Sequence, residues 1–281
     1  MKLLILGGNG MAGHVLVDYF RRHGRHHVFY TSRDPRDPEG LFLDAADSFL
    51  VEKVVEIVRP DIVINAVGVL NQFAAADKIN AYHINGFLPH RLQRVADTVG
   101  ARLIHISTDC VFEGTKGSYR EDDEPDGTSV YAVTKALGEV HAPGHVTIRT
   151  SIIGPEIRGG GIGLMNWFMN SSGEVSGYKN VMWNGVTTLE LAKAIDTLMD
   201  SPLSGLIHLS HEPAVCKHDL LLMMQEIWGL EHITVIPSEE PHQDRTLIST
   251  RSDWHYAVPN YREMLEELKR WMNERKNYEA K

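Results

Sequence analysis

The stretch Leu3-Leu4-Ile5-Leu6-Gly7-Gly8-Asn9-Gly10-Met11-Ala12-Gly13 opens the chain and decides the fold that the sequence predicts. Its four apolar residues predict a short buried strand, and apolar positions at helical spacing over 11–22 predict a helix directly behind it. Gly7 permits a tight turn, Gly10 lets the backbone approach a pyrophosphate, and Gly13 allows the helix to pack closely on the strand. The helix N-terminus adds amides and a positive dipole end. The stretch therefore predicts a dinucleotide-binding site, with an ordinary glycine-bearing turn as the alternative.

The same alternation of strand and helix runs through the first half of the chain. Apolar runs predict four further strands, over 27–30, 61–67, 103–107 and 145–149. Between them lie helical patterns over 48–58, over 74–99 as one long helix or two, and over 130–141. Fully apolar strands that alternate with helices favour a parallel sheet covered on both faces, because right-handed crossovers place the helices on either side.

The pattern changes after Thr150. Residues 154–188 are rich in Gly, Asn and Ser and are expected to form loops over a site, with Gly159-Gly160-Gly161 as a flexible tract. The remainder predicts helices over 189–199, 217–228 and 261–277 and a strand over 206–209. No linker separates the two parts, so residues 154–281 are expected to form a small lobe folded onto a domain of residues 1–153.

Composition and charge exclude several classes of function. Lys and Arg total 28 against 37 acidic residues, a formal charge of −9, and no basic run occurs, which argues against a nucleic-acid partner. The cysteines, Cys110 and Cys216, lie far apart and predict no disulfide, as expected in a reducing compartment. No apolar run approaches the roughly 18 residues that span a bilayer, and the first apolar run is too short for a secretory leader. A cytoplasmic protein without a membrane partner is expected.

The end of the second predicted strand bears on the choice of dinucleotide. Enzymes that use NAD usually place an acidic residue there, which binds the adenosine ribose. This chain instead reads Tyr30-Thr31-Ser32-Arg33, in which a hydroxyl and a cation suit the 2′-phosphate of NADP. Asp34 follows at once, and a shift of one residue would restore an acid. The sequence favours NADPH, with NADH as the alternative.

Three residues suggest carbonyl chemistry. Tyr131 and Lys135 are spaced as i and i+4 in a predicted helix, so they share one face. An ammonium beside a phenol would lower the pKa of Tyr131 from its usual value of about 10. Thr108 follows the fourth predicted strand, at the edge where such sheets bind ligands, and could hold a carbonyl oxygen while Tyr131 protonates it. Taken singly, Tyr-x-x-x-Lys also occurs on solvated helix faces, and Thr108 could be a strand-end cap.

Together these motifs carry a family resemblance that covers almost the whole chain. The order and spacing of Gly7-x-x-Gly10-x-x-Gly13, Ser107-Thr108-Asp109 and Tyr131-x-x-x-Lys135 resemble the extended short-chain dehydrogenase/reductase superfamily, and most closely its dTDP-4-dehydrorhamnose reductase branch. Further matching pieces are Asn65-Ala66-Val67-Gly68, Asn85-Gly86, Arg149-Thr150-Ser151 and Trp183-Asn184-Gly185-Val186-Thr187-Thr188. The resemblance implies an α/β fold with a Rossmann-type doubly wound parallel sheet and a small C-terminal substrate-binding lobe.

The resemblance also assigns roles to individual residues. Thr108, Tyr131 and Lys135 would be the catalytic triad of an NADPH-dependent reductase acting on a nucleoside-diphosphate-linked 4-keto-6-deoxy sugar. The cofactor contacts would be Gly7, Asn9, Gly10, Met11, Ser32, Arg33, Asp44, Ala45, Asn65, Ala66 and Val67, with Tyr131 and Lys135. The substrate contacts would be Asp109, Cys110, Ile152 and Trp183. Arg158 and Lys179 are candidates for the diphosphate of the substrate, with a role as solvated surface cations as the alternative.

Two departures from the family pattern concern the sugar. The rhamnose branch usually has Tyr at the position of Cys110, and an aromatic residue where this chain reads Ile152-Ile153-Gly154. Both positions face the sugar in that family. The resemblance therefore implies that the reductase chemistry survives, while the identity of the sugar stays open.

Other functions remain open on the sequence alone. A sugar-nucleotide epimerase or dehydratase of the same superfamily would retain NAD, and usually has the acidic residue that Ser32-Arg33 replaces. Some relatives of the branch are NADP-binding regulatory subunits that do not catalyse a reaction, and homodimers are frequent in the superfamily. The sequence predicts no metal site, because Cys216-x-His218 lacks a second pair of ligands.

Overall fold

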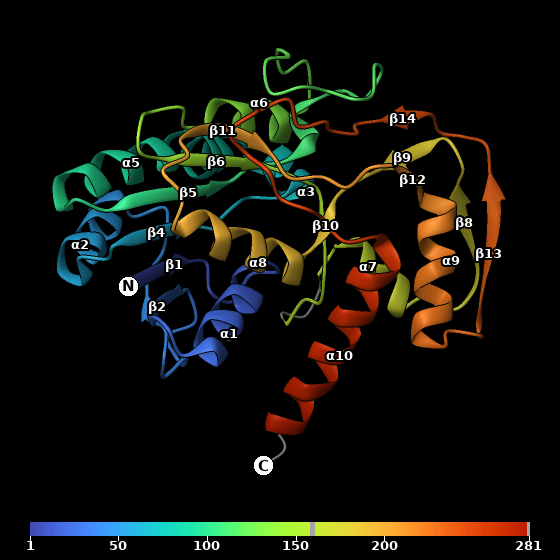
Figure 1. The fold of residues 1–281 in the computed structure, drawn as a ribbon, viewed down its shortest axis with the longest axis horizontal. Helices are drawn as coiled ribbons and strands as arrows, with labels where there is room; N and C mark the ends of the chain where they lie inside the picture. The colour runs from blue at the N-terminus through green and yellow to red at the C-terminus, as the bar shows by residue number, and fades with distance from the viewer. Residues whose placement is uncertain (158–160, 280–281) are drawn as a thin grey trace.

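β1 (Lys2–Leu6) pairs in parallel with β2 (His27–Ser32) on one side and with β4 (Ile62–Asn65) on the other. The structure is a computed structural model, and it describes residues 1–157 and 161–279 of the chain. A seven-stranded parallel sheet extends from these pairs in the order β11-β6-β5-β4-β1-β2-β3 (Figure 1). The outer members are β3 (Leu41–Phe42), β5 (Arg102–Ile106), β6 (Val146–Arg149) and β11 (Gly205–His208). The expected doubly wound parallel sheet is confirmed, and its order reverses between β1 and β4.

Side chains of β1 point alternately into two apolar cores, one on each face of the sheet. Leu3 and Ile5 belong to a core that includes residues of α1 (Gly13–His23) and α8 (Thr188–Met199). Leu4 and Leu6 belong to the opposite core, which α2 (Ser48–Val58) and α5 (Leu88–Val99) complete. Successive residues of a strand face opposite sides, so a strand buried on both faces must be apolar throughout. Figure 1 shows these helices around the sheet.

The glycine-rich turn connects β1 to α1 and leaves no room for side chains at its ends. Gly7 has a φ of 80°, a conformation that favours glycine, and its carbonyl accepts the N–H of Gly10 at 2.8 Å. A Cβ placed on Gly13 would lie 2.0 Å from the carbonyl oxygen of Gly7. The helix therefore packs against the turn at a distance that only glycine allows, as the sequence predicts.

The region predicted as one long helix or two contains four consecutive helical segments. They are α3 (Asn71–Ala76), α4 (Lys78–Ala81), a π-helical turn η1 (Tyr82–Phe87) and α5. Asp77 separates the first two, since its backbone leaves the helical region and its carboxylate caps α4 by accepting the N–H of Asn80. In the π turn, the amide of Asn85 bonds both the N–H and the carbonyl of Val69, at 2.8 and 2.9 Å. Asn85 thus fixes the loop that follows β4.

The described residues of 154–188 contain more helix and strand than the loops that the sequence predicts. They contain α7 (Leu164–Met169), β8 (Gly173–Tyr178), β9 (Val181–Trp183) and β10 (Val186–Thr187). β8 pairs along its length with β13 (Ile233–Ser238), far away in sequence, and this distant partner satisfies the backbone of a polar segment. The other short strands are β7 (Ile152–Ile153), which pairs with β10, and β12 (Val215–Cys216) and β14 (Gln243–Asp244), which flank β9.

The remaining helices join the two parts of the chain. α6 (Val130–Leu137) ends earlier than expected, whereas α9 (Lys217–Trp228) has its predicted bounds and α10 (Tyr261–Glu279) ends the described chain. Side chains of α9 and α10 belong to the same apolar core as Leu3 and Ile5 of the main sheet. The division of the chain at residues 153 and 154 remains a prediction. None of the described helices is long and apolar enough to cross a membrane.

Candidate active site

A pocket opens at the carboxyl ends of β1 and β4, where the strand order reverses, and its volume is about 140 Å³. Ligands of doubly wound sheets bind at this position. Residues predicted to hold a cofactor line it: Gly7, Gly10, Ser32, Arg33, Asp44, Ala45, Ala66 and Val67. Residues that the sequence did not indicate also line it: Thr31, Leu43, Gly68, Val69, Asn80 and Ile84. Most of these follow β4 or lie in the helices that Asn85 anchors, which the strand-end pattern does not reveal.

At the end of β2, Arg33 lines this pocket and the neighbouring Asp34 does not. Arg33 is exposed at the pocket and has no ion-pair partner within the described part of the chain. The carboxylate of Asp34 accepts two bonds from Arg36, at 3.0 and 2.9 Å, and Asp34 does not line the pocket. The shift of one residue that would have restored an acid has therefore not occurred.

Asn9 and Met11, both predicted cofactor contacts, lie outside the lining of this pocket. The amide of Asn9 donates to Ser32 and to Asp37, both at 2.9 Å, so it ties the glycine-rich turn to the loop after β2. Burial tends to raise the pKa of Asp37, but hydrogen bonds from Asn9 and Tyr30 outweigh it and leave that pKa lowered. Met11 lies against the loop that includes Gly163.

Thr108 and Tyr131 meet beyond the end of β5. Thr108 caps the short helical turn η2 (Asp109–Val111), since its Oγ1 accepts the N–H of Cys110 at 3.1 Å and donates to the carboxylate of Asp109 at 3.0 Å. Burial raises the pKa of Tyr131 above its usual value, and the nearby Cys110 and Asp109 act in the same direction. The nearby hydroxyl of Thr108 partly opposes this shift. Tyr131 is therefore a protonated phenol.

Lys135 lies one turn after Tyr131 on α6 and is 4% exposed. Its Nζ donates to the carbonyl of Ile106 at 2.7 Å and lies 3.4 Å from Nε2 of His105. Burial lowers the pKa of Lys135 to about 8, although the charge of Glu139 opposes the change. The expectation that Lys135 lowers the pKa of Tyr131 is wrong for this structure, because the ammonium is directed toward β5 and burial dominates at the phenol.

Two cations that the sequence did not indicate complete the neighbourhood of Asp109 and Cys110. Lys217, at the start of α9, places its Nζ 5.3 Å from the centre of the Trp183 ring. Burial lowers the pKa of Lys217 to about 8, although the nearby Asp109 opposes the change. Arg245 follows β14, and its Nη1 lies 3.6 Å from Sγ of Cys110. Both come from segments whose position depends on distant strand pairing.

The two acidic groups of this neighbourhood respond to its burial. Desolvation raises the pKa of Asp109, while its bond from Thr108 and the charges of Lys217 and Arg245 lower it in part. Desolvation also raises the pKa of Cys110 to about 12, and Asp109 adds to the shift. Cys110 is therefore a neutral thiol. The site combines a phenol, a hydroxyl and two cations around the partly buried carboxyl group of Asp109.

Comparison with known proteins now identifies the family. The family model described as the RmlD substrate binding domain matches residues 1–246. The chain belongs to this family. It is 28% identical over 232 residues to the dTDP-4-dehydrorhamnose reductase of Mycobacterium tuberculosis, which covers 77% of this chain and 72% of that protein. It is 26% identical over 252 residues to the spore coat polysaccharide biosynthesis protein SpsK of Bacillus subtilis, with 87% and 86% covered.

A solved structure shares the fold of this RmlD-family chain. The dTDP-4-dehydrorhamnose reductase of Bacillus anthracis, solved in complex with NADP, superposes with a TM-score of 0.82. The match covers 96% of this chain and 99% of that one, at 21% sequence identity. The agreement extends over both the main sheet and the C-terminal elements that the sequence pattern did not predict.

The remaining residues predicted for the substrate lie in different places in the RmlD-family chain. Ile152 is in β7, partly buried and paired with Val186, and Trp183 is 3% exposed beneath Lys217. Lys179 is half-exposed and faces Glu239 at 3.9 Å, which favours the surface-cation alternative. Arg158, like part of the predicted glycine tract, lies outside the described residues.

Cys216, His218 and Asp219 place their potential metal ligands within 4.8 Å of one another. Internal contacts account for this arrangement. Sγ of Cys216 caps α9 by accepting the N–H of Asp219 at 3.5 Å, and Nδ1 of His218 lies 2.8 Å from the carboxylate of Asp219.

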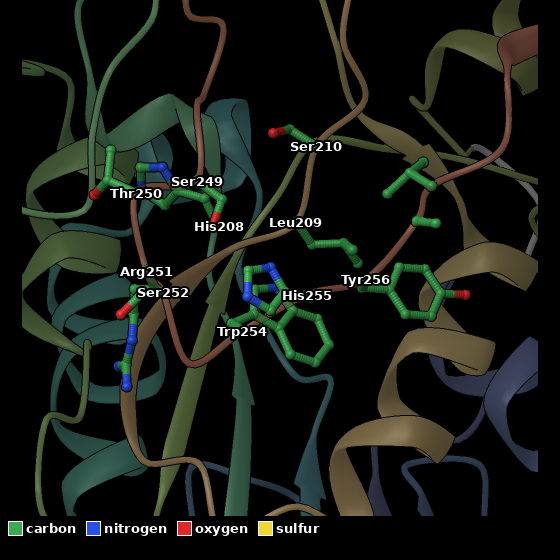
Figure 2. A pocket seen from close by; sticks show the side chains of 12 residues that line it. His208, Leu209, Ser210, Ser249, Thr250, Arg251, Ser252, Trp254, His255 and Tyr256 are labelled. Atoms are coloured by element: carbon green, nitrogen blue, oxygen red, sulfur yellow. The ribbon is translucent and has the colours of Figure 1, made fainter.

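A separate cavity of about 580 Å³ lies between the end of β11 and residues 249–258 (Figure 2). Figure 2 shows His208, Arg251 and Trp254 around it. Arg251 donates to the carboxylate of Asp253 and to the carbonyl of Ser204, so its guanidinium is already paired within the protein. None of the residues predicted for cofactor or substrate lines this cavity.

Proposed function

We propose that this protein is an NADPH-dependent reductase of a nucleoside-diphosphate-linked 4-keto-6-deoxy sugar, of the dTDP-4-dehydrorhamnose reductase type. The observation that carries the proposal is the proximity of Thr108 and Tyr131 beyond the end of β5, with Lys135 one turn after Tyr131 on α6. The name of the Mycobacterium tuberculosis relative and the NADP bound by the Bacillus anthracis protein support it.

The cofactor site fits a dinucleotide on its own residues. The turn from Gly7 to Gly13 presents backbone where Cβ atoms could not be accommodated, and the exposed Arg33 borders the pocket. A guanidinium at the ribose end suits the 2′-phosphate of NADPH. When bound, NADPH supplies the hydride.

The protein residues supply the proton and hold the oxygen. The raised pKa of Tyr131 keeps its hydroxyl protonated at neutral pH, so it can donate a proton to the carbonyl oxygen as negative charge develops there. The hydroxyl of Thr108 donates to Asp109 in this structure, and it would rotate to donate a second hydrogen bond to that oxygen. Lys135 would anchor the cofactor ribose.

The substrate proposal rests on Lys217 and Arg245. Their charges flank Asp109 and Cys110 beside Tyr131, and two cations suit the diphosphate of a nucleotide sugar. We therefore assign the diphosphate to these residues in place of Lys179. The proposal includes action in the cytoplasm, which two free cysteines suit, and leaves a homodimer as an expectation from the superfamily.

Replacing Arg245 or Lys217 with methionine is expected to raise KM for the nucleotide sugar by about 10- to 100-fold, the loss of one hydrogen bond to a charged group. KM for NADPH should stay unchanged. Steady-state kinetics with each substrate varied in turn would measure both. Lys179→Met is the matched control, because its exposed ammonium faces Glu239 at 3.9 Å. An effect of Lys179→Met alone would refute the assignment.

Replacing Arg33 with alanine is expected to raise the Kd of NADPH by about tenfold, the size of one charge-assisted bond to phosphate. The Kd of NADH should not change, because NADH lacks the 2′-phosphate. Fluorescence titration with both nucleotides measures the two constants, and NADH serves as the internal control. An equal loss for both would show that Arg33 does not read the phosphate.

The function itself is tested by nicotinamide absorbance with a panel of nucleotide-linked 4-keto-6-deoxy sugars. Oxidation of NADPH with one panel member is the expected result. Tightly bound NAD⁺ in the purified protein, with isomerisation and no net oxidation, would indicate an epimerase. Tight NADPH binding without turnover, together with stable co-purification of another enzyme, would indicate a regulatory subunit.

A further inference from the structure

A chain of buried side chains connects the end of β4 to Lys135. Asn65 and His105 are both 0% exposed, and they occupy paired positions on the neighbouring strands β4 and β5. Nδ2 of Asn65 lies 3.1 Å from Nδ1 of His105, and Nε2 of His105 lies 3.4 Å from Nζ of Lys135. The mechanism proposed above assigns no role to His105.

The orientation of the Asn65 amide determines where His105 carries its proton. The N–H of Val67 donates to Oδ1 of Asn65 at 3.1 Å, so the NH₂ group must face the imidazole. Nδ1 of His105 is then an acceptor and carries no hydrogen. Burial lowers the pKa of His105 well below its usual value, and the charges of Lys135 and His90 act in the same direction. The neutral ring therefore carries its single proton on Nε2.

This tautomer directs an N–H at Lys135. An ammonium has three donors and no acceptor, so it cannot accept that N–H, whereas a neutral amine can. The other groups that face this pair are Glu139, whose charge favours the ammonium, and His90, which acts on His105. The carboxylate of Glu139 is in turn held by Arg149, with both bonds at 2.7 Å. In addition to burial, the Nε2–H of His105 thus opposes the charged form of Lys135.

We propose that His105, locked by Asn65 as the Nε2-protonated tautomer, is a positioning residue that controls whether Lys135 is charged. His105 touches neither substrate nor cofactor in this role and acts only through Lys135. The consequence for turnover rests on the reductase function proposed above, whereas the tautomer and the titration of Lys135 do not.

Nitrogen-15 spectroscopy of the histidine rings tests the tautomer in the unmodified protein. The signals of His105 are those lost in His105→Gln. The expected pattern has a protonated Nε2 and an unprotonated Nδ1 at neutral pH. A protonated Nδ1, or an imidazolium, would overturn the proposal without any further variant.

Asn65→Asp is expected to reverse the tautomer of the His105 ring. A carboxylate would accept a proton on Nδ1, so Nε2 would become an acceptor for the ammonium of Lys135. We expect the titration midpoint of Lys135 to rise by about 1 to 2 pH units, the worth of one hydrogen bond to a charged group. In His105→Gln, where the side-chain oxygen can accept, the midpoint should rise as well. Carbon-13 signals of labelled lysine measure it, assigned by the signal lost in Lys135→Met.

His90→Gln is the matched control, because it removes a nearby imidazole and keeps the contact between the Asn65 amide and Nδ1 of His105. In this variant, the titration midpoint of Lys135 should equal that of the unmodified protein. An unmoved midpoint in both Asn65→Asp and His105→Gln would overturn the proposal. If the ammonium is the active form, the alkaline decline of kcat should move to higher pH by the same amount in these two variants. Since the spectra need no turnover, failure of the reductase assay and failure of this proposal are distinguishable.

Discussion

Tyr131→Phe is expected to lower kcat for NADPH-dependent reduction by about 10²- to 10⁴-fold, the contribution of a positioned general acid. The substitution removes one oxygen and keeps the ring in its place on α6. Thr108 would still hold the carbonyl oxygen, but no group at the phenol position could protonate it. Because Tyr131 does not contribute to the pocket that Arg33 borders, the Kd of NADPH should be retained.

Single-turnover absorbance measurements separate this chemical defect from substrate binding. Tyr178→Phe is the control, since Tyr178 is an exposed tyrosine at the end of β8 and should retain full activity. A loss of less than about tenfold in Tyr131→Phe would remove Tyr131 as the acid, since even modest general acids contribute more. The hydroxyl of Thr108 would then be the next candidate for the proton donor.

The parts of the fold that the sequence could predict are those with local causes. β1 and its glycine-rich turn follow from four apolar residues and from glycines whose spacing leaves no room for a Cβ. α2 and α9 have their predicted bounds because apolar spacing and caps lie within each segment. The choice of Arg33 over Asp34 was predicted from the strand end, and the bonds from Arg36 to Asp34 explain it.

The parts that the sequence could not predict depend on distant partners. β8 is a polar segment that becomes a strand only beside β13. Lys217 and Arg245 come to the site because β12 and β14, which precede them, pair with β9. Helical spacing places Tyr131 and Lys135 on one face of α6 but does not set the direction of the ammonium. The wrong expectation for the pKa of Tyr131 arose there, because burial outweighs a cation that is directed elsewhere.

Glu139→Gln is expected to lower the free energy of unfolding by about 3 to 5 kcal/mol, the cost of breaking one buried ion pair. The side chains of Glu139 and Arg149 are 2% and 3% exposed, and two bonds of 2.7 Å join them. Ser107 donates a further bond to the Glu139 carboxylate at 2.7 Å. The substitution would leave the guanidinium buried without its counter-charge.

Neighbouring groups cannot compensate for the lost carboxylate. Arg149 also lies over the ring of Phe112 at 5.0 Å, and its Nη1 lies 3.5 Å from Nε2 of His208. Burial lowers the pKa of His208, so the ring is neutral, and its Nδ1–H is committed to the carbonyl of Ile248. A neutral imidazole can accept from the guanidinium but cannot neutralise it.

Denaturant unfolding measures the change in the free energy of unfolding, and two further variants serve as comparisons. Glu226→Gln removes an exposed ion pair with Arg262 and should leave the free energy of unfolding nearly unchanged. A double replacement of Glu139 and Arg149 by leucine should recover most of the loss, because it leaves no charge unpaired. If Glu139→Gln were no worse than Glu226→Gln, the pair would not stabilise the fold. Glu139 follows the C-terminal end of α6 and Arg149 ends β6, so the pair holds the end of the helix that carries Tyr131 against the sheet. The double variant would therefore show whether that helix needs the charges or only the packing.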